Sequence, residues 1–488
     1  MKRRKGLGII VALTFICLST GTGFCTDKNS PPAYADSGDE STAEQGENLS
    51  ERLKSIELKL EAQEKIMLAE EQILADQGSL LNTMINEGKL PEWVKKVKLS
   101  GDFRLRYQSD MFGQDNPELL KPDDPRTIMN TQEDRDRLRI RFRLGLTAKV
   151  NDRMEIGARL TTGNEKEPVS TNETLGDYSN KDGLVIDRAY LQIRPVNRAA
   201  FWFGRMPNPF DSTDLVWDKD LNLEGLALTA TANDPKALVE KNWDLSVTAG
   251  FFPLQELEYF SDDKYLYGGQ IGAKYKPVTA LGLKLAVAYY DYRNIEGKFN
   301  DPAGPGDETD YTLPAFQQKG NTLFNINTKM NDKGEIAKKL ALASDFNQLD
   351  INSSIEIAIK TIAVQLMADY VKNLGFDKDK VRERTGVEVP EETEGYQVGV
   401  AVGHREVKDL WQWNGSLSFR HLEADAVIDA FTDSDFHLGG TNAEGWILGV
   451  QLGVGKNAWL SFNWLTADEI GGPPLAVDVM QIDLNAAF

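Results

Sequence analysis

From Val97 to its last residue the chain alternates apolar and polar residues with a period of two. One run shows this plainly, with Leu138, Ile140, Phe142, Leu144 and Leu146 alternating with Arg137, Arg139, Arg141 and Arg143. Successive side chains of a β-strand point to opposite faces, so each such segment has one apolar and one polar face. About 16 segments of roughly ten residues follow one another, a length that crosses a bilayer at the strand tilt of a barrel.

The connections between these segments alternate in length. We expect tight turns at 151, 195–197, 277–280, 361, 406–409 and 455–457, and long polar loops at 110–133, 163–182, 207–220, 294–346, 375–394 and 423–443. Short turns on one rim and long loops on the other are typical of an outer-membrane barrel whose short side is periplasmic. Residues 97–488 are therefore predicted to form an all-β, transmembrane antiparallel β-barrel of about 16 strands (range 16–18).

Segment 294–346 leaves two possibilities open because it is too long for a simple loop. It adds a hairpin around Thr322 to Lys329, which raises the strand count to 18, or it folds into the lumen as a constriction. Beyond the N-terminus no run of about 18 apolar residues occurs, which excludes helical membrane spans.

The N-terminus has the pattern of an export signal, with Lys2, Arg3, Arg4 and Lys5 followed by a short apolar run from 7 to 18. We expect residues 1–35 to be a signal peptide cut after Ala35, with an earlier cut between Thr20 and Thr26 as the other option. Both cysteines, Cys17 and Cys25, then leave with it. A lipoprotein anchored through Cys25 is disfavoured because Phe24 stands where a small residue is needed.

A disordered linker at 36–48 and a coiled coil at 49–90 are predicted next. The seam of the coil is a heptad pattern made by Leu53, Ile56, Leu60, Met67, Leu74, Leu81 and Met84. Gly88 and Pro91 end this helix. The pattern favours a periplasmic stalk that joins copies of the chain through residues 49–87, a trimer being the first candidate; a single amphipathic helix packed on its own chain is the alternative.

Charge limits the partners of this chain. Lys and Arg number 55 against 75 Asp and Glu, a formal charge of -20 that argues against nucleic acid. A row of arginines nevertheless shares the polar face of the first strands, and we propose as pore-lining candidates Arg104, Arg106, Arg137, Arg139, Arg141, Arg143, Glu155 and Arg159. If luminal, they form a basic wall that attracts anions. The alternative is that several of them only pair with loop carboxylates.

The sequence offers little for catalysis. Its three histidines, His404, His421 and His437, are scattered, and there is no Gly-x-Ser-x-Gly motif and no His/Cys cluster with metal-ligand spacing. We therefore expect no enzyme, no metal and no cofactor.

Aromatic residues near strand ends, among them Trp202, Trp217, Tyr290 and Trp459, are expected to form the girdles of a membrane interface. The chain ends in Phe488, in register with the apolar face of the last strand, which resembles the C-terminal signal for barrel assembly.

Three motif blocks add a resemblance to a known family: residues 204–210 (GRMPNPF), residues 215–221 (LVWDKDL), and residues 422–426 (LEADA) with 435–437 (DFH). They resemble a family of Gram-negative proteins described as putative porins, and the likeness covers about residues 49–488. The resemblance implies a general or weakly selective porin and brings no catalytic residues and no established substrate.

These observations together predict an outer-membrane porin through which small hydrophilic solutes or ions diffuse passively. The main alternative is a secreted, soluble β-protein that binds glycans or the cell wall and buries its apolar faces in a core. An outer-membrane enzyme such as a lipase is a second alternative, which would need a Ser or His at the membrane rim.

Overall fold

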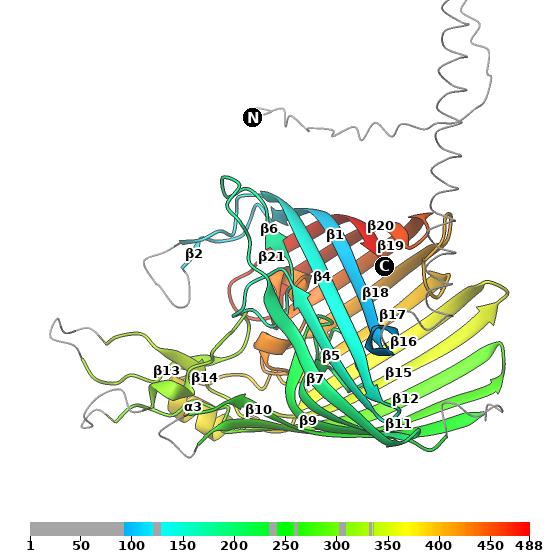
Figure 1. Ribbon diagram of the computed structural model, residues 1–488. Coiled ribbons are helices and arrows are strands. Elements are labelled where there is room, and N and C mark those ends of the chain that lie inside the picture. The colour runs from blue at the N-terminus through cyan, green and yellow to red at the C-terminus, as the bar shows by residue number, and fades with distance from the viewer. Residues whose placement is uncertain are drawn as a thin grey trace, which may run out of the picture. The chain divides into compact units, whose positions relative to one another are not determined.

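The computed structural model describes residues 92–120, 128–233, 242–257, 262–301, 309–330, 334 and 336–488. The predicted signal peptide, linker and coiled coil lie outside these residues, as do both cysteines. Within the described part, residues 97–488 are dominated by β-strands (Figure 1).

Seventeen strands form the main sheet, of which one, β6 (Glu173–Thr174), has only two residues; the other sixteen run across the wall. They are β1 (Val97–Phe112), β4 (Arg135–Asn151), β5 (Met154–Thr161), β7 (Val185–Val196), β8 (Ala199–Pro207), β9 (Asn222–Thr231), β10 (Trp243–Gln255), β11 (Lys264–Val278), β12 (Leu281–Arg293), β15 (Asn347–Ile359), β16 (Ile362–Asn373), β17 (Glu394–Gly403), β18 (Trp413–Leu422), β19 (Ala443–Gly455), β20 (Ala458–Glu469) and β21 (Ala476–Ala487).

The sheet closes on itself. Each long strand pairs antiparallel with its neighbours in sequence, and the first strand, β1, also pairs with the last, β21, with Asp102 opposite Ala487 and Phe112 opposite Val477. Phe488 extends this seam, because its N–H and carbonyl both pair with the backbone of Gly101 at 3.0 Å. A closed sheet has no unpaired edge, so every strand is satisfied by two neighbours. The prediction of about 16 antiparallel strands in a barrel is confirmed.

Most connections on the rim where the described strands begin and end have two residues, the β9–β10 and β17–β18 connections being longer, and the longest loops lie on the other rim. On the long-loop rim α3 (Lys378–Thr385) follows β16, and a separate two-stranded sheet, β13 (Leu323–Asn325) with β14 (Leu340–Leu342), follows β12. This hairpin does not join the barrel wall, so the predicted increase to 18 strands is wrong. It packs instead with α3, where Phe324, Ile326 and Val381 form a small apolar cluster.

Two loops from the long-loop rim fold inside the barrel. The β8–β9 loop (208–221) bonds to opposite walls: Asn352 of β15 donates to the carbonyl of Asp211 at 2.6 Å, and Arg143 of β4 donates to Asp220 at 3.0 Å. The β18–β19 loop (423–442) packs beside it, and Asp218 N–H donates to the carbonyl of Phe431 at 2.8 Å. The barrel interior is therefore narrowed by chain from both loops.

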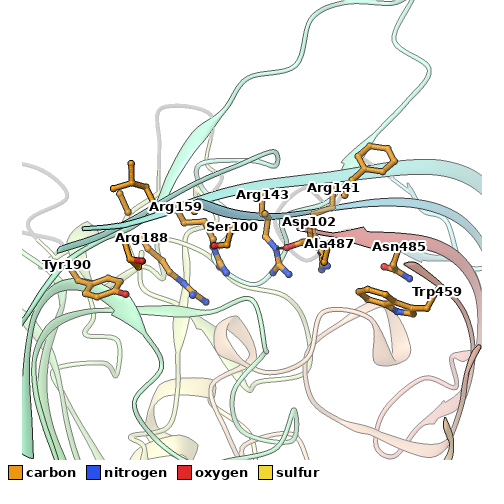
Figure 2. A pocket seen from close by; sticks show the side chains of 16 residues that line it. Ser100, Asp102, Arg141, Arg143, Arg159, Arg188, Tyr190, Trp459, Asn485 and Ala487 are labelled. Carbon is orange, nitrogen blue, oxygen red and sulfur yellow. Dashed lines mark hydrogen bonds and ion pairs between the residues drawn. The ribbon is translucent and has the colours of Figure 1, made fainter. Parts of the chain in front are cut away.

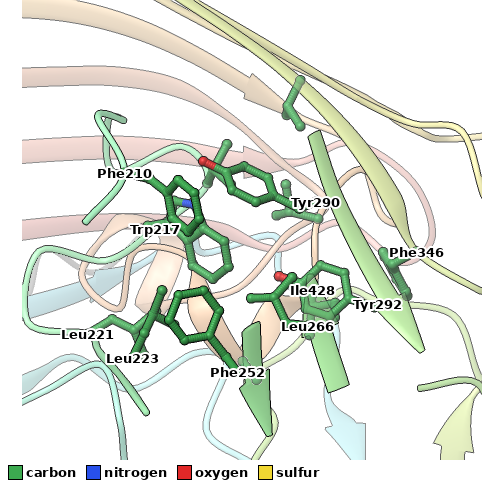
Figure 3. Packing of buried hydrophobic residues seen from close by; sticks show 14 of the residues in the cluster. Phe210, Trp217, Leu221, Leu223, Phe252, Leu266, Tyr290, Tyr292, Phe346 and Ile428 are labelled. Atoms are coloured by element: carbon green, nitrogen blue, oxygen red, sulfur yellow. The ribbon is translucent and has the colours of Figure 1, made fainter. Parts of the chain in front are cut away.

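An apolar core forms where these loops meet the strands (Figure 3). Trp217 lies at its centre, with its ring edge-on to Tyr290 at 5.1 Å between centroids. Leu215 and Val216 of the same loop are buried against it. This core explains why a short apolar triplet stands within an otherwise polar loop.

The outward face of the wall is apolar. Leu99, Phe103, Leu138, Ile271 and Leu366 are all exposed to the outside although each lies within a strand.

The aromatic girdle is only partly as predicted. Trp243, Tyr289, Trp446 and Trp464 are exposed on the outer face, which agrees with an interfacial position, whereas Trp217 and Tyr290 are buried inside the barrel. Two more of the predicted girdle residues, Trp202 and Trp459, fall on the inward phase of their strands, opposite Gln192 and Asn485. Among the described residues, no helix has the length and apolarity needed to cross a membrane.

Candidate functional site: the charged lumen

The predicted arginines lie on the inward face of neighbouring strands. In the register of β1 and β4, Arg104 stands opposite Arg141 and Arg106 opposite Arg139. Directly opposed residues of an antiparallel pair have their Cβ atoms about 5 Å apart, so these are like charges at close range. Such an arrangement requires either water or carboxylates nearby to offset the repulsion.

Carboxylates supply much of this compensation, most of them from the wall itself. Asp102 accepts from Arg141 at 2.9 Å and from Arg143 at 2.7 Å. Asp483 of β21 accepts from Arg106 at 2.8 Å. Two further pairs, Arg137 with Asp110 and Arg159 with Asp187, are also wall to wall. The alternative drawn from the sequence, pairing with loop acids, applies to Arg106 and Arg143, which reach Asp435 and Asp220.

Among the luminal arginines, Arg139 and Arg188 have no carboxylate within ion-pair distance in the part of the chain that the structure describes. Arg139 donates to the side-chain oxygen of Gln108 at 3.3 Å, and Arg188 donates to the side-chain oxygen of Asn222 at 2.7 Å. Both partners are neutral, so neither guanidinium group is in direct contact with a carboxylate. Arg188 was missed in the sequence because its strand does not repeat arginine at every second position.

The inward loops place acids against this basic wall. Asp435 lies 3.2 Å from Arg106. Burial alone would raise the pKa of Asp435, but Arg106, Lys219, Arg104 and Arg139 outweigh it and hold this pKa well below its usual range. Asp435 is therefore ionised at neutral pH and neutralises part of the wall.

Across the lumen, β15 and β16 each carry a buried aspartate. Asp350 of β15 is fully buried, and neither of its carboxylate oxygens has a hydrogen-bond donor among the described groups. Asp369 of β16 accepts from Thr213 of the inward loop and keeps its other oxygen without a donor. The interior thus carries most of its arginines on β1, β4, β5 and β7, together with aspartates that pair with them, whereas Asp350 and Asp369 on β15 and β16 have no ion pair among the described groups.

A pocket of about 400 Å³ lies on the short-turn side of the arginines (Figure 2). Arg141, Arg143, Arg159 and Arg188 point into this space, and Tyr190 lies at one end of it. Glu155 is further toward the short turns, opposite Gln192, and has no ion pair within the described residues. The structure therefore gathers the predicted arginines on one luminal face and leaves Glu155 apart from them.

The histidines give no common site. His437 is buried in the β18–β19 loop, His421 lies on β18 beside Glu444, and His404 follows β17 at the short-turn rim. Burial, and then the charge of Lys319, lowers the pKa of His437 to about 3, so it is neutral near pH 7. Among the described residues, no group of three or more His, Cys, Asp or Glu side chains is placed to hold a metal ion.

A closed ring of sixteen antiparallel strands with an apolar outer face, a charged interior and two loops folded inward defines the class of β-barrel to which outer-membrane porins belong. A family model described as "Putative porin" matches residues 82–488. The chain belongs to this family, which confirms the resemblance drawn from the motif blocks. All three blocks contribute to the inward loops or to the strand ends that carry them.

Comparison with solved structures finds similar chains at low identity, some of them described as outer membrane proteins. They include OprB of Pseudomonas putida at high pH, with 10% identity over 85% of this chain and 97% of that one and a TM-score of 0.46. A loop-deletion mutant of OmpT of Vibrio cholerae has 11% identity over 80% of this chain and 100% of that one, with a TM-score of 0.42. OmpF of Salmonella typhi in complex with daunomycin is similar at 10% identity over 80% and 97% of the two chains, with a TM-score of 0.42. Comparison with curated proteins finds no match.

Proposed function

We propose that this protein is an outer-membrane porin through which small hydrophilic solutes or ions diffuse passively. The observation that carries the proposal is the closed barrel whose outward residues are apolar and whose inward residues are charged. In hydrocarbon every backbone polar group needs a partner, which a closed sheet provides and an open one does not. A secreted, soluble β-protein would bury its apolar strand faces in a core. In this protein the outward apolar side chains of the strands are exposed.

Water in the lumen is supported by the exposure of charged groups inside the barrel. Lys219 belongs to the inward β8–β9 loop, yet its side chain is 56% exposed. Arg139 and Arg188 keep their charge without a carboxylate at contact distance. Solvated charges along a passage bias the concentration of ions of opposite sign. We therefore expect a passage that favours anions at the arginine wall, while Asp435 limits the preference.

Passive diffusion needs no catalytic residue and no cofactor, so the proposal includes the expectation that this protein is not an enzyme. It also includes export by residues 1–35, insertion with the short turns in the periplasm, and association of copies, a trimer first, through residues 49–87. The exposed position of Phe488 on the outer face agrees with a role as assembly signal.

Liposome swelling tests the proposal directly. Purified protein is refolded into liposomes and diluted into isotonic solutions of neutral sugars of increasing size. Swelling that is fast for small sugars and falls off with size supports a water-filled passage; liposomes with heat-denatured protein are the control. Protein that stays soluble without detergent and never enters liposomes would contradict the proposal and favour the secreted β-protein. Folded, inserted protein that admits no sugar or ion would mean a barrel closed by its inward loops.

A further inference from the structure

A second pocket lies near the long-loop rim, apart from the arginine wall. It has a volume of about 370 Å³ and is lined by the ends of β8 to β11 and by the loops after β12 and β18. Its surface is mainly apolar and aromatic, from Phe252, Leu254, Ile295, Phe316, Leu342 and Phe431. The volume falls within the range of small-molecule sites, which are mostly apolar with a few placed polar groups.

One buried cation stands in this apolar lining. Lys264, the first residue of β11, is 3% exposed and lines the pocket. Its ammonium donates to the backbone carbonyl of Leu313 at 3.0 Å, and no carboxylate is within ion-pair distance in the described part of the chain. An ammonium has three protons to donate, and burying it without a counter-charge is costly. Among the described groups of the pocket, this positive site has no anion in contact with it.

A second polar group stands directly beside this lysine. Gln255 of β10 is opposite Lys264 in the strand register and also lines the pocket. The oxygen of its side-chain amide is buried and has no donor among the described groups. A primary amide has two donors and one acceptor and adapts by rotation, so it can hydrogen-bond to either a carboxylate or a hydroxyl.

The acids in the lining do not cancel the lysine. Glu224 pairs with Arg205. The carboxyl of Asp429 is buried, and burial raises its pKa to about 7, although the backbone N–H groups of Ala430 and Gln318 oppose this shift. Glu165 belongs to the β5–β7 loop at the rim. The pocket thus combines an unmatched cation with an apolar body.

We propose that this pocket binds a small organic acid, with its carboxylate on Lys264 and Gln255 and its aromatic or aliphatic part against Phe252, Phe316 and Phe431. The inference deepens the proposed function, since it names a class of solute taken up at the long-loop mouth. A carboxylate would supply the counter-charge that Lys264 lacks, in an apolar site where a charged hydrogen bond is strong. The carbon skeleton would replace water on the aromatic surfaces.

Binding of benzoate to the purified, folded protein in detergent, followed by calorimetry or ligand-observed NMR, tests the inference. Benzamide has the same ring without the charge, and acetate has the charge without the ring. We expect benzoate to bind at least tenfold more tightly than either. Lys264→Met, which keeps the length of the side chain but not its charge, should weaken benzoate binding at least tenfold. Lys274→Met, on the same strand toward the opposite rim, should leave it unchanged.

Phe316→Ala provides an independent test should Lys264→Met fail to fold, as judged by heat-modifiable migration. It should weaken benzoate several-fold and leave the binding of acetate unchanged. The inference is overturned if benzoate binds equally well to the wild type and to Lys264→Met. It is also overturned if the wild type binds benzamide as tightly as benzoate, or if folded protein binds no benzoate. Conductance in potassium chloride separates the two proposals: a conducting protein without benzoate binding refutes only this inference, and a benzoate-binding protein without conductance refutes only the porin.

Discussion

Arg139→Glu should change the ion preference of the lumen. An ion about 7 Å from the guanidinium group in water gains or loses about 0.6 kcal/mol per unit charge. The substitution changes the local charge by two, and screening at about 0.1 M salt halves the effect. Anions should become about threefold scarcer at this point and cations about threefold more abundant. The ratio of cation to anion permeability should therefore rise roughly fivefold to tenfold.

Arg139 is suited to this test because it has a neutral partner, so its loss leaves no unpaired carboxylate. The assay is the reversal potential across a planar bilayer under a potassium chloride gradient. Arg139→Gln, which changes the charge by one, should give about half the shift in free energy. Arg405→Glu is the control for a charge reversal at the short-turn rim, where Arg405 is exposed and pairs with Glu356. An unchanged reversal potential in folded Arg139→Glu would refute the idea that this wall sets selectivity. Adding Arg141→Glu should increase the shift further.

Three more outcomes follow from the structure. Trp217→Ala should destabilise the inward loops by about 3–5 kcal/mol and raise single-channel conductance, because it removes the ring packed on Tyr290; unchanged conductance would mean that these loops do not limit the passage. Deleting Phe488 removes two backbone hydrogen bonds to Gly101 and should lower the fraction of heat-modifiable barrel in membranes, whereas a normal yield would show that it is dispensable. Burial raises the pKa of Asp429 to about 7, so the folded state keeps a proton that the unfolded chain releases above about pH 4. The contribution of Asp429 to the free energy of unfolding is complete in acid and is lost as pH rises to about 7, by about 1.4 kcal/mol per pH unit. Urea unfolding should show this decrease in the wild type, and Asp429→Asn should abolish it.

The barrel could be predicted from the sequence because its strands are specified locally. The alternation from Leu138 to Leu146 identifies the outward and inward faces of β4 without knowledge of any partner. The same pattern placed the arginines on one face. Their cross-strand partners, such as Asp483 for Arg106, were not predictable, since they depend on how β1 closes against β21.

The inward loops could not be predicted in this way. Trp217 was expected at the membrane interface because it stands near a strand end, but it is buried in the lumen. The neighbouring Leu215 and Val216 were the available signal, since apolar residues in a polar loop need a core to cover them. For segment 294–346 the sequence left open a hairpin near Thr322 to Lys329 or a constriction; the segment forms the β13–β14 hairpin outside the wall and lies along the β18–β19 loop, where Asn321 donates to the carbonyl of Ala424 at 2.7 Å. Which loop enters the barrel depends on tertiary contacts rather than on loop length.

The proposed function requires a water-filled passage through the barrel. Single-channel recording of the purified, refolded protein in a planar bilayer under a salt gradient tests it most directly. We predict discrete steps whose current is proportional to voltage, with a reversal potential that gives the sign of the selectivity. Silence from protein that is folded and inserted, at every salt concentration and voltage applied, would contradict the account.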